Sequence, residues 1–100
     1  MVELTVQKGL KLAVKAHQEG KIKEAEDLYR AIIKADPENL DARHNLGVLL
    51  VRLNKLEEAL SLFELVVSKN SQMGQFWLSY IDCLTKLSLE TEAEIALKSA

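Results

Sequence analysis

Residues 46–63 read LGVLLVRLNKLEEALSLF, and this stretch has counterparts 34 residues before it and 34 residues after it. Four positions recur in the same order: a large apolar residue, a turn residue, an alanine and a second large residue. They are occupied by Leu12, Leu46 and Tyr80, by Gly20, Asn54 and Ser88, by Ala25, Ala59 and Ala93, and by Tyr29, Phe63 and Leu97. A fixed period of this length indicates a repeat architecture, in which each unit covers the apolar surface of its neighbour.

Each repeat contains two segments with the apolar spacing of an amphipathic helix. Ala25, Leu28, Tyr29 and Ile32, for example, stand at i, i+3, i+4 and i+7. We predict helices over residues 4–18, 22–35, 39–52, 56–69, 73–86 and 90–100. A proline, Pro37, separates the first repeat from the second, and the side chains of Asn70 and Ser71 are expected to cap the start of the fifth helix.

The recurring alanine predicts a close approach between the two helices of each repeat, because a small side chain leaves room for a larger one on the partner helix. Ala13 and Gly47 are the expected small partners in the first helices of their repeats. Cys83, the only cysteine, lies on an apolar helical segment and is predicted to be a buried, unreactive thiol.

Composition favours an ordinary globular protein, with 48% hydrophobic and 28% charged residues. The formal net charge of −2 gives no strong field for nucleic acid or an anionic membrane. The N-terminus lacks a basic region followed by an apolar core, so we predict no signal peptide. No apolar run is long enough for a membrane span. A single cysteine suits a reducing compartment, so we expect a cytoplasmic protein that binds neither nucleic acid nor membrane.

The period, the Leu46-Gly47 pair, Ala59 and Phe63 resemble the tetratricopeptide repeat. The resemblance covers essentially the whole chain as three consecutive repeats of about 6–39, 40–73 and 74–100. It implies an all-α fold: a right-handed α-solenoid of three antiparallel helix-turn-helix hairpins, with six helices in a single domain over residues 1–100. Three positions depart from the family pattern: Gly9 and Arg43 stand where it usually carries Trp, and Ile81 replaces the small residue found at Gly47. The third repeat is also shorter than the other two.

The first repeat differs from the others along one face of its first helix. Lys8 and Lys15 replace the apolar residues found there in later repeats, and Lys11 shares their face. We interpret this stripe as a solvated cap for the end of the solenoid. A site for an anionic ligand is the alternative.

The resemblance also implies a concave wall lined by the first helix of each repeat. An apolar strip on this wall would mark a binding surface for a peptide or helix, with Arg52 and Lys86 placed to meet an acidic group. The predicted partner-binding residues are Leu10, Val14, His17, His44, Asn45, Val48, Val51, Arg52, Leu78, Asp82 and Lys86. A flanking helix of the same longer protein could fill the groove instead.

Three more specific functions are not predicted. Family members that hold the C-terminal carboxylate of heat-shock chaperones use a set of five polar residues, of which only Asn45 is matched here. A metal shared by His17 and His44 would have to bridge about 10 Å along neighbouring helices. We therefore expect no metal and no cofactor, and no arrangement of nucleophile and base indicates catalysis.

The sequence thus predicts a non-catalytic protein-interaction module. Two alternatives remain open. The chain could be the N-terminal scaffold segment of a larger enzyme, such as a glycosyl- or sulfate-transferring one. It could also self-assemble, forming a homodimer through the open C-terminal face of its last repeat.

Overall fold

The computed structural model describes residues 2–87, 95, 97 and 98. Within residues 2–87 the chain forms five helices and no strand. They are α1 (Val2–Gln18), α2 (Ile22–Ala35), α3 (Leu40–Arg52), α4 (Leu56–Lys69) and α5 (Gly74–Lys86). Each begins and ends within two residues of its predicted bounds. The predicted sixth helix, 90–100, lies almost entirely outside the described residues, as does Ala93.

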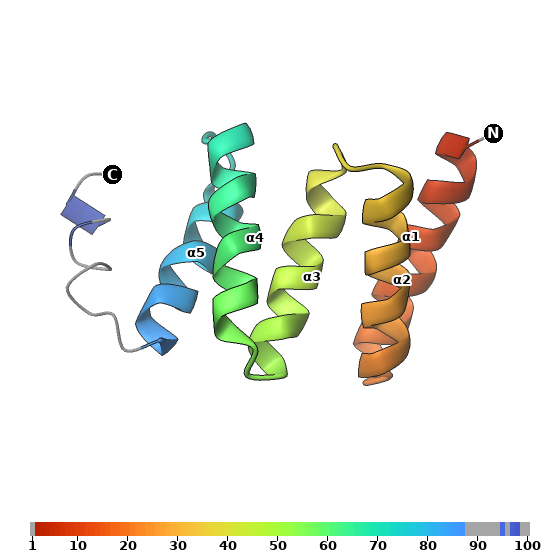
Figure 1. The fold of residues 1–100 in the computed structure, drawn as a ribbon, viewed down its shortest axis with the longest axis horizontal. Coiled ribbons are helices and arrows are strands. Elements are labelled where there is room, and N and C mark those ends of the chain that lie inside the picture. Colours follow the sequence, from red (N-terminus) through yellow and green to blue (C-terminus); the bar gives the residue numbers. More distant parts are fainter. Residues whose placement is uncertain (1, 88–94, 96, 99–100) are drawn as a thin grey trace.

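Consecutive helices pack against each other in a row, as Figure 1 shows. In addition α1 contacts α3, and α3 contacts α5. Helices α1, α3 and α5 therefore form one layer, and α2 and α4 form the other. The molecule measures 43 × 26 × 18 Å, the elongated shape of helix pairs stacked side by side, so the predicted all-α solenoid is confirmed.

The two turns within repeats have the same geometry. Gly20 and Asn54, at equivalent positions, have φ angles of 79° and 60°, the left-handed conformation that glycine and asparagine tolerate best. The amide of the following lysine donates to a carbonyl five residues back in each turn, from Lys21 to Ala16 and from Lys55 to Leu50, at 2.8 Å. These bonds end the first helix of each pair and reverse the chain.

The start of α5 differs from the prediction. Asn39 caps α3, because its Oδ1 accepts a hydrogen bond from the Ala42 amide at 3.0 Å. The position equivalent to Asn39 in the next repeat is Met73, which offers no side-chain cap. The predicted role of Asn70 and Ser71 as caps is therefore wrong, since both lie too far upstream; Asn70 instead accepts a bond from the Gln72 amide within the turn.

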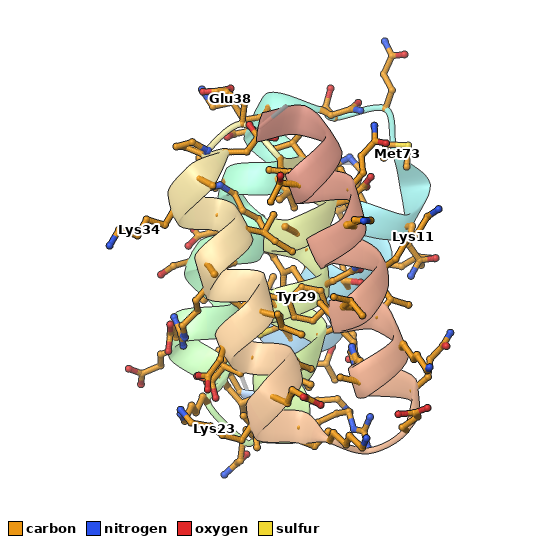
Figure 2. The ribbon with its side chains drawn as sticks, turned by 90° about the vertical axis from the view of Figure 1, so that its right-hand side faces the viewer. Lys11, Lys23, Tyr29, Lys34, Glu38 and Met73 are labelled. Atoms are coloured by element: carbon orange, nitrogen blue, oxygen red, sulfur yellow. The ribbon has the colours of Figure 1, made fainter. Side chains whose placement is uncertain are left out.

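The core lies between the two layers. Tyr29 and Phe63 are fully buried, and Figure 2 shows Tyr29 enclosed between α1 and α2. Ala13, Ala25 and Ala59 have no exposed surface, as their role at close helix crossings predicts.

Helices α3 and α4 approach closely at Gly47. A Cβ atom added to Gly47 would lie 2.5 Å from Phe63 Cε1 and 2.8 Å from its Cζ. Since the Phe63 ring is itself buried, it has little room to withdraw. Only glycine fits at this crossing.

Gly47→Ala is therefore expected to destabilise the protein. Overpacking costs about 1–3 kcal/mol, which outweighs the gain of about 1 kcal/mol that alanine gives within a helix. Urea unfolding followed by circular dichroism measures the difference. Gly74→Ala is the matched control, because no atom lies within 4 Å of its added Cβ. Equal effects of the two substitutions would contradict the packing described here.

Candidate functional site

A groove lies on the side of the solenoid formed by α3 and α5. Its volume is about 430 Å³. The residues that line it come from both helices, with one contribution from α4: Val48, Val51, Arg52, Phe63, Gln75, Leu78, Ser79 and Asp82. Five of these are among the predicted partner-binding residues, and the fold brings them together although they span 35 positions of sequence.

The groove combines an apolar surface with charges at its edge. Leu78 is 65% exposed, a large fraction for a leucine, and the buried Phe63 ring forms part of the floor. Asp82 pairs with Lys86 one turn further along α5, at 3.7 Å. Arg52 forms no ion pair with any residue that the structure describes, so its guanidinium is available at the rim.

The predicted residues of α1 do not line this groove. Leu10 and Val14 are half-buried and pack against the core. His17 Nδ1 lies 3.2 Å from the Tyr29 hydroxyl, within hydrogen-bond distance. Burial, and then the positive charge of Arg52, lower the pKa of His17 below its ordinary value of 6.5.

His44 does not lie open on the wall as the sequence suggested. It is 8% exposed, and its ring packs between Phe63 and Phe76 at centroid distances of 5.7 and 5.0 Å. His44 Nε2 forms a 2.7 Å hydrogen bond with Ser79 Oγ. His44 thus joins α3 to α5 and lies beside the groove, which Ser79 lines. Its neighbour Asn45 is half-buried.

Burial also sets the charge of His44. Desolvation lowers the pKa of His44 below 6.5, although a hydrogen bond donated to Asn45 and the charge of Asp41 partly offset it. The folded protein therefore favours the neutral imidazole, whose unprotonated nitrogen can accept a hydrogen bond from the Ser79 hydroxyl.

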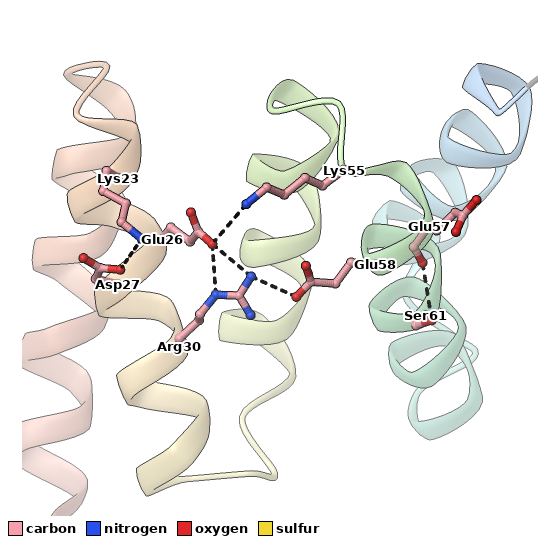
Figure 3. Close-up of polar contacts among 8 residues, drawn as sticks. All are labelled: Lys23, Glu26, Asp27, Arg30, Lys55, Glu57, Glu58 and Ser61. Carbon is pink, nitrogen blue, oxygen red and sulfur yellow. Dashed lines mark hydrogen bonds and ion pairs between the residues drawn. The ribbon is translucent and has the colours of Figure 1, made fainter.

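Sequence patterns alone did not identify a charged network between the repeats (Figure 3). Arg30 of α2 lies 2.9 Å from Glu26 on its own helix and 2.8 Å from Glu58 of α4, and Lys55 approaches the same Glu26 oxygen at 3.8 Å. Burial opposes the charge of Arg30, but the hydrogen bonds and charges of Glu58 and Glu26 outweigh it and raise the pKa of Arg30. The i, i+4 spacing of Glu26 and Arg30 is the feature of the sequence that could have predicted part of this network.

Neither a metal site nor a nucleophile emerges from the described residues. No three His, Cys, Asp or Glu side chains within them gather closely enough to hold a metal ion. Cys83 is buried, as predicted, and its thiol donates to the Leu56 carbonyl at 3.4 Å. Burial, and then the charge of Asp82, raise the pKa of Cys83, which favours the thiol over the reactive thiolate. None of the five helices is long and apolar enough to cross a membrane.

The lowered pKa of His44 predicts a loss of stability in acid. The unfolded chain takes up a proton near pH 6.5, whereas the folded chain resists it, so the free energy of unfolding falls as the pH drops below about 6.5. In His44→Gln this fall, measured by urea unfolding between about pH 7.5 and pH 5.5, is expected to be shallower than in wild type. His17→Gln is the comparison variant and retains the contribution of His44. A His44→Gln slope as steep as that of wild type would refute the assignment.

Solved structures with the same fold include proteins that occur in complexes. A mutant of MamA matches with a TM-score of 0.84 and 23% identity, covering 94% of this chain and 69% of that one. The first TPR of Spaghetti, bound to an HSP90 peptide, matches with a TM-score of 0.85 and 25% identity, covering 93% and 74%. The CopN–Scc3 complex gives 0.86 and 18%, covering 93% of this chain and 55% of that chain.

No curated protein has significant sequence similarity to the chain. The sequence pattern that defines the tetratricopeptide repeat, in contrast, matches residues 16–77. This range includes the turn at Gly20, the Gly47–Phe63 crossing and the first turn of α5. On this match and on its helical solenoid, the chain belongs to the tetratricopeptide repeat family.

Proposed function

We propose that the chain is a non-catalytic protein-interaction module that binds a peptide or helix of another protein in the groove between α3 and α5. The observation that carries this proposal is the apolar groove itself, in which Leu78 lies exposed beside Val48 and Val51. Exposed, contiguous apolar surface of this kind favours association, because covering it removes apolar area from water. We further propose that the binding unit is one domain of three repeats.

Charge at the rim refines the kind of ligand. Arg52 is a cation with no acidic partner in the described part of the chain, and a guanidinium binds carboxylates in a two-pronged geometry. A ligand with an aliphatic side chain for the groove and an acidic group near Arg52 would satisfy both. The peptide complex of the Spaghetti repeat supports this general mode, since that protein binds an HSP90 peptide on the same fold.

The particular HSP90-type contact is not part of the proposal. Four of the five polar residues expected for a chaperone-tail carboxylate, the cationic ones among them, are replaced by Leu10, Val14, Gln75 and Ser79. Of these, Leu10 and Val14 pack against the core, and Gln75 and Ser79 carry no charge. The ligand preference of this groove therefore depends on apolar contact and on Arg52, and not on the set of polar residues that holds a chaperone-tail carboxylate.

Leu78→Glu is expected to abolish partner binding without unfolding the protein, because the Leu78 side chain is largely exposed. Placing a charge in an apolar contact typically weakens binding tenfold or more. Affinity capture from a cell lysate, quantified by mass spectrometry, compares this variant with wild type. The matched control is Leu12→Glu, the same change at a leucine that is 58% exposed but lies outside the groove. Equal capture by all three proteins, each folded by circular dichroism, would rule out the proposed groove.

A further inference from the structure

A second and larger hollow lies on the other side of the solenoid, where α2 and α4 stand on either side of α3 (Figure 1). Its volume is about 610 Å³. Four apolar residues line it: Ile33, Leu46, Leu62 and Leu65. The polar residues around them are Arg30, Lys34, Arg43, Glu58 and Ser61. None of these residues belongs to the groove between α3 and α5.

The hollow occurs at the position of Arg43. In the next repeat the equivalent residue is Trp77, 34 positions later. Both side chains donate to the carbonyl of the preceding inter-repeat turn: Arg43 Nε to Pro37 at 2.9 Å, and Trp77 Nε1 to Ser71 at 2.7 Å. Arg43 thus keeps the same tether but replaces an indole ring with a narrow, charged chain. The Arg43 side chain therefore fills less of the space between the helices than an indole ring would, and it places a cation at the edge of that space.

The charges around the hollow are not balanced. Its one acidic residue, Glu58, is already paired with Arg30, which also binds Glu26 (Figure 3). Lys34 and Arg43 form no ion pair with any described residue, and Figure 2 shows Lys34 pointing away from the helix pair into solvent. The hollow therefore has an apolar floor and a rim with two unpaired cations.

We propose that this hollow is a second docking site, and that it binds an acidic segment of another protein. One bulky apolar side chain of that segment packs on Ile33, Leu62 and Leu65, and its carboxylates pair with Lys34 and Arg43. Charge complementarity selects this ligand, because a basic or neutral segment would leave both cations unpaired. The end face of a second copy fits poorly: its exposed Leu12 shares α1 with Lys8, Lys11 and Lys15, which would face like charges.

A library of random short peptides, displayed on phage and selected on the wild-type chain, tests the proposal. Peptides that survive counter-selection against Arg43→Trp are expected to be acidic and to carry a large apolar residue. Arg43→Trp inserts the residue of the next repeat, which fills the hollow and removes a cation. Lys34→Glu gives a second test at an exposed site, where folding is not at risk. Lys34→Glu, which takes no part in the selection, is expected to weaken binding of a selected peptide at least tenfold, and high salt is expected to weaken binding of that peptide to wild type.

The matched control is Lys69→Glu, an exposed lysine in the last turn of α4 that does not line the hollow. This control should bind a selected peptide as wild type does, and peptide-induced amide shifts should centre on Ile33, Leu62 and Leu65. The proposal is overturned if no acidic peptide is enriched, or if Lys34→Glu binds a selected peptide as well as wild type does. It is also overturned if Leu78→Glu, rather than Lys34→Glu, abolishes binding.

Discussion

Coverage of one helix pair by the next is the constraint on which the rest of this structure depends. Leu12 and Leu46 are the same residue at the same position of successive repeats. Leu46 is 2% exposed because α2 packs against its helix, whereas Leu12, in the first repeat that the structure describes, is 58% exposed. Lys8 and Lys15 likewise lie exposed where Ala42 and Leu49 are buried. Whether a side chain at a given repeat position is buried therefore depends on the helix pair packed against it, and not on the residue type alone.

The same stacking creates both candidate binding surfaces. On one side α3 and α5 meet through the hydrogen bond of the buried His44 with Ser79, and Ser79 lines the groove. On the other side α2 and α4 are joined by Arg30 and Glu58, and a hollow remains where Arg43 occupies the position of an aromatic residue. Local departures from the repeat pattern thus distinguish this chain from a generic array.

The periodicity predicted most of the fold, because each repeat encodes its own turn and its own helix crossing. Gly20 and Asn54 supply the turn conformation, and Gly47 admits Phe63. Exposure was harder to predict, since it depends on neighbours in space. A family register places His44 on the inner wall, but only the structure shows Phe76 covering its ring. The hollow beside Arg43 also required coordinates, since an unfilled volume leaves no pattern in sequence.

Paired substitutions at the two equivalent leucines test the stacking account most directly. Urea unfolding of Leu46→Ala is expected to show a loss of about 2–5 kcal/mol, the cost of removing a buried leucine side chain. Leu12→Ala is expected to change the free energy of unfolding by less than about 0.5 kcal/mol, as exposed substitutions do. Equal losses at the two positions would contradict the account, because they would show that the first repeat is covered as fully as the second.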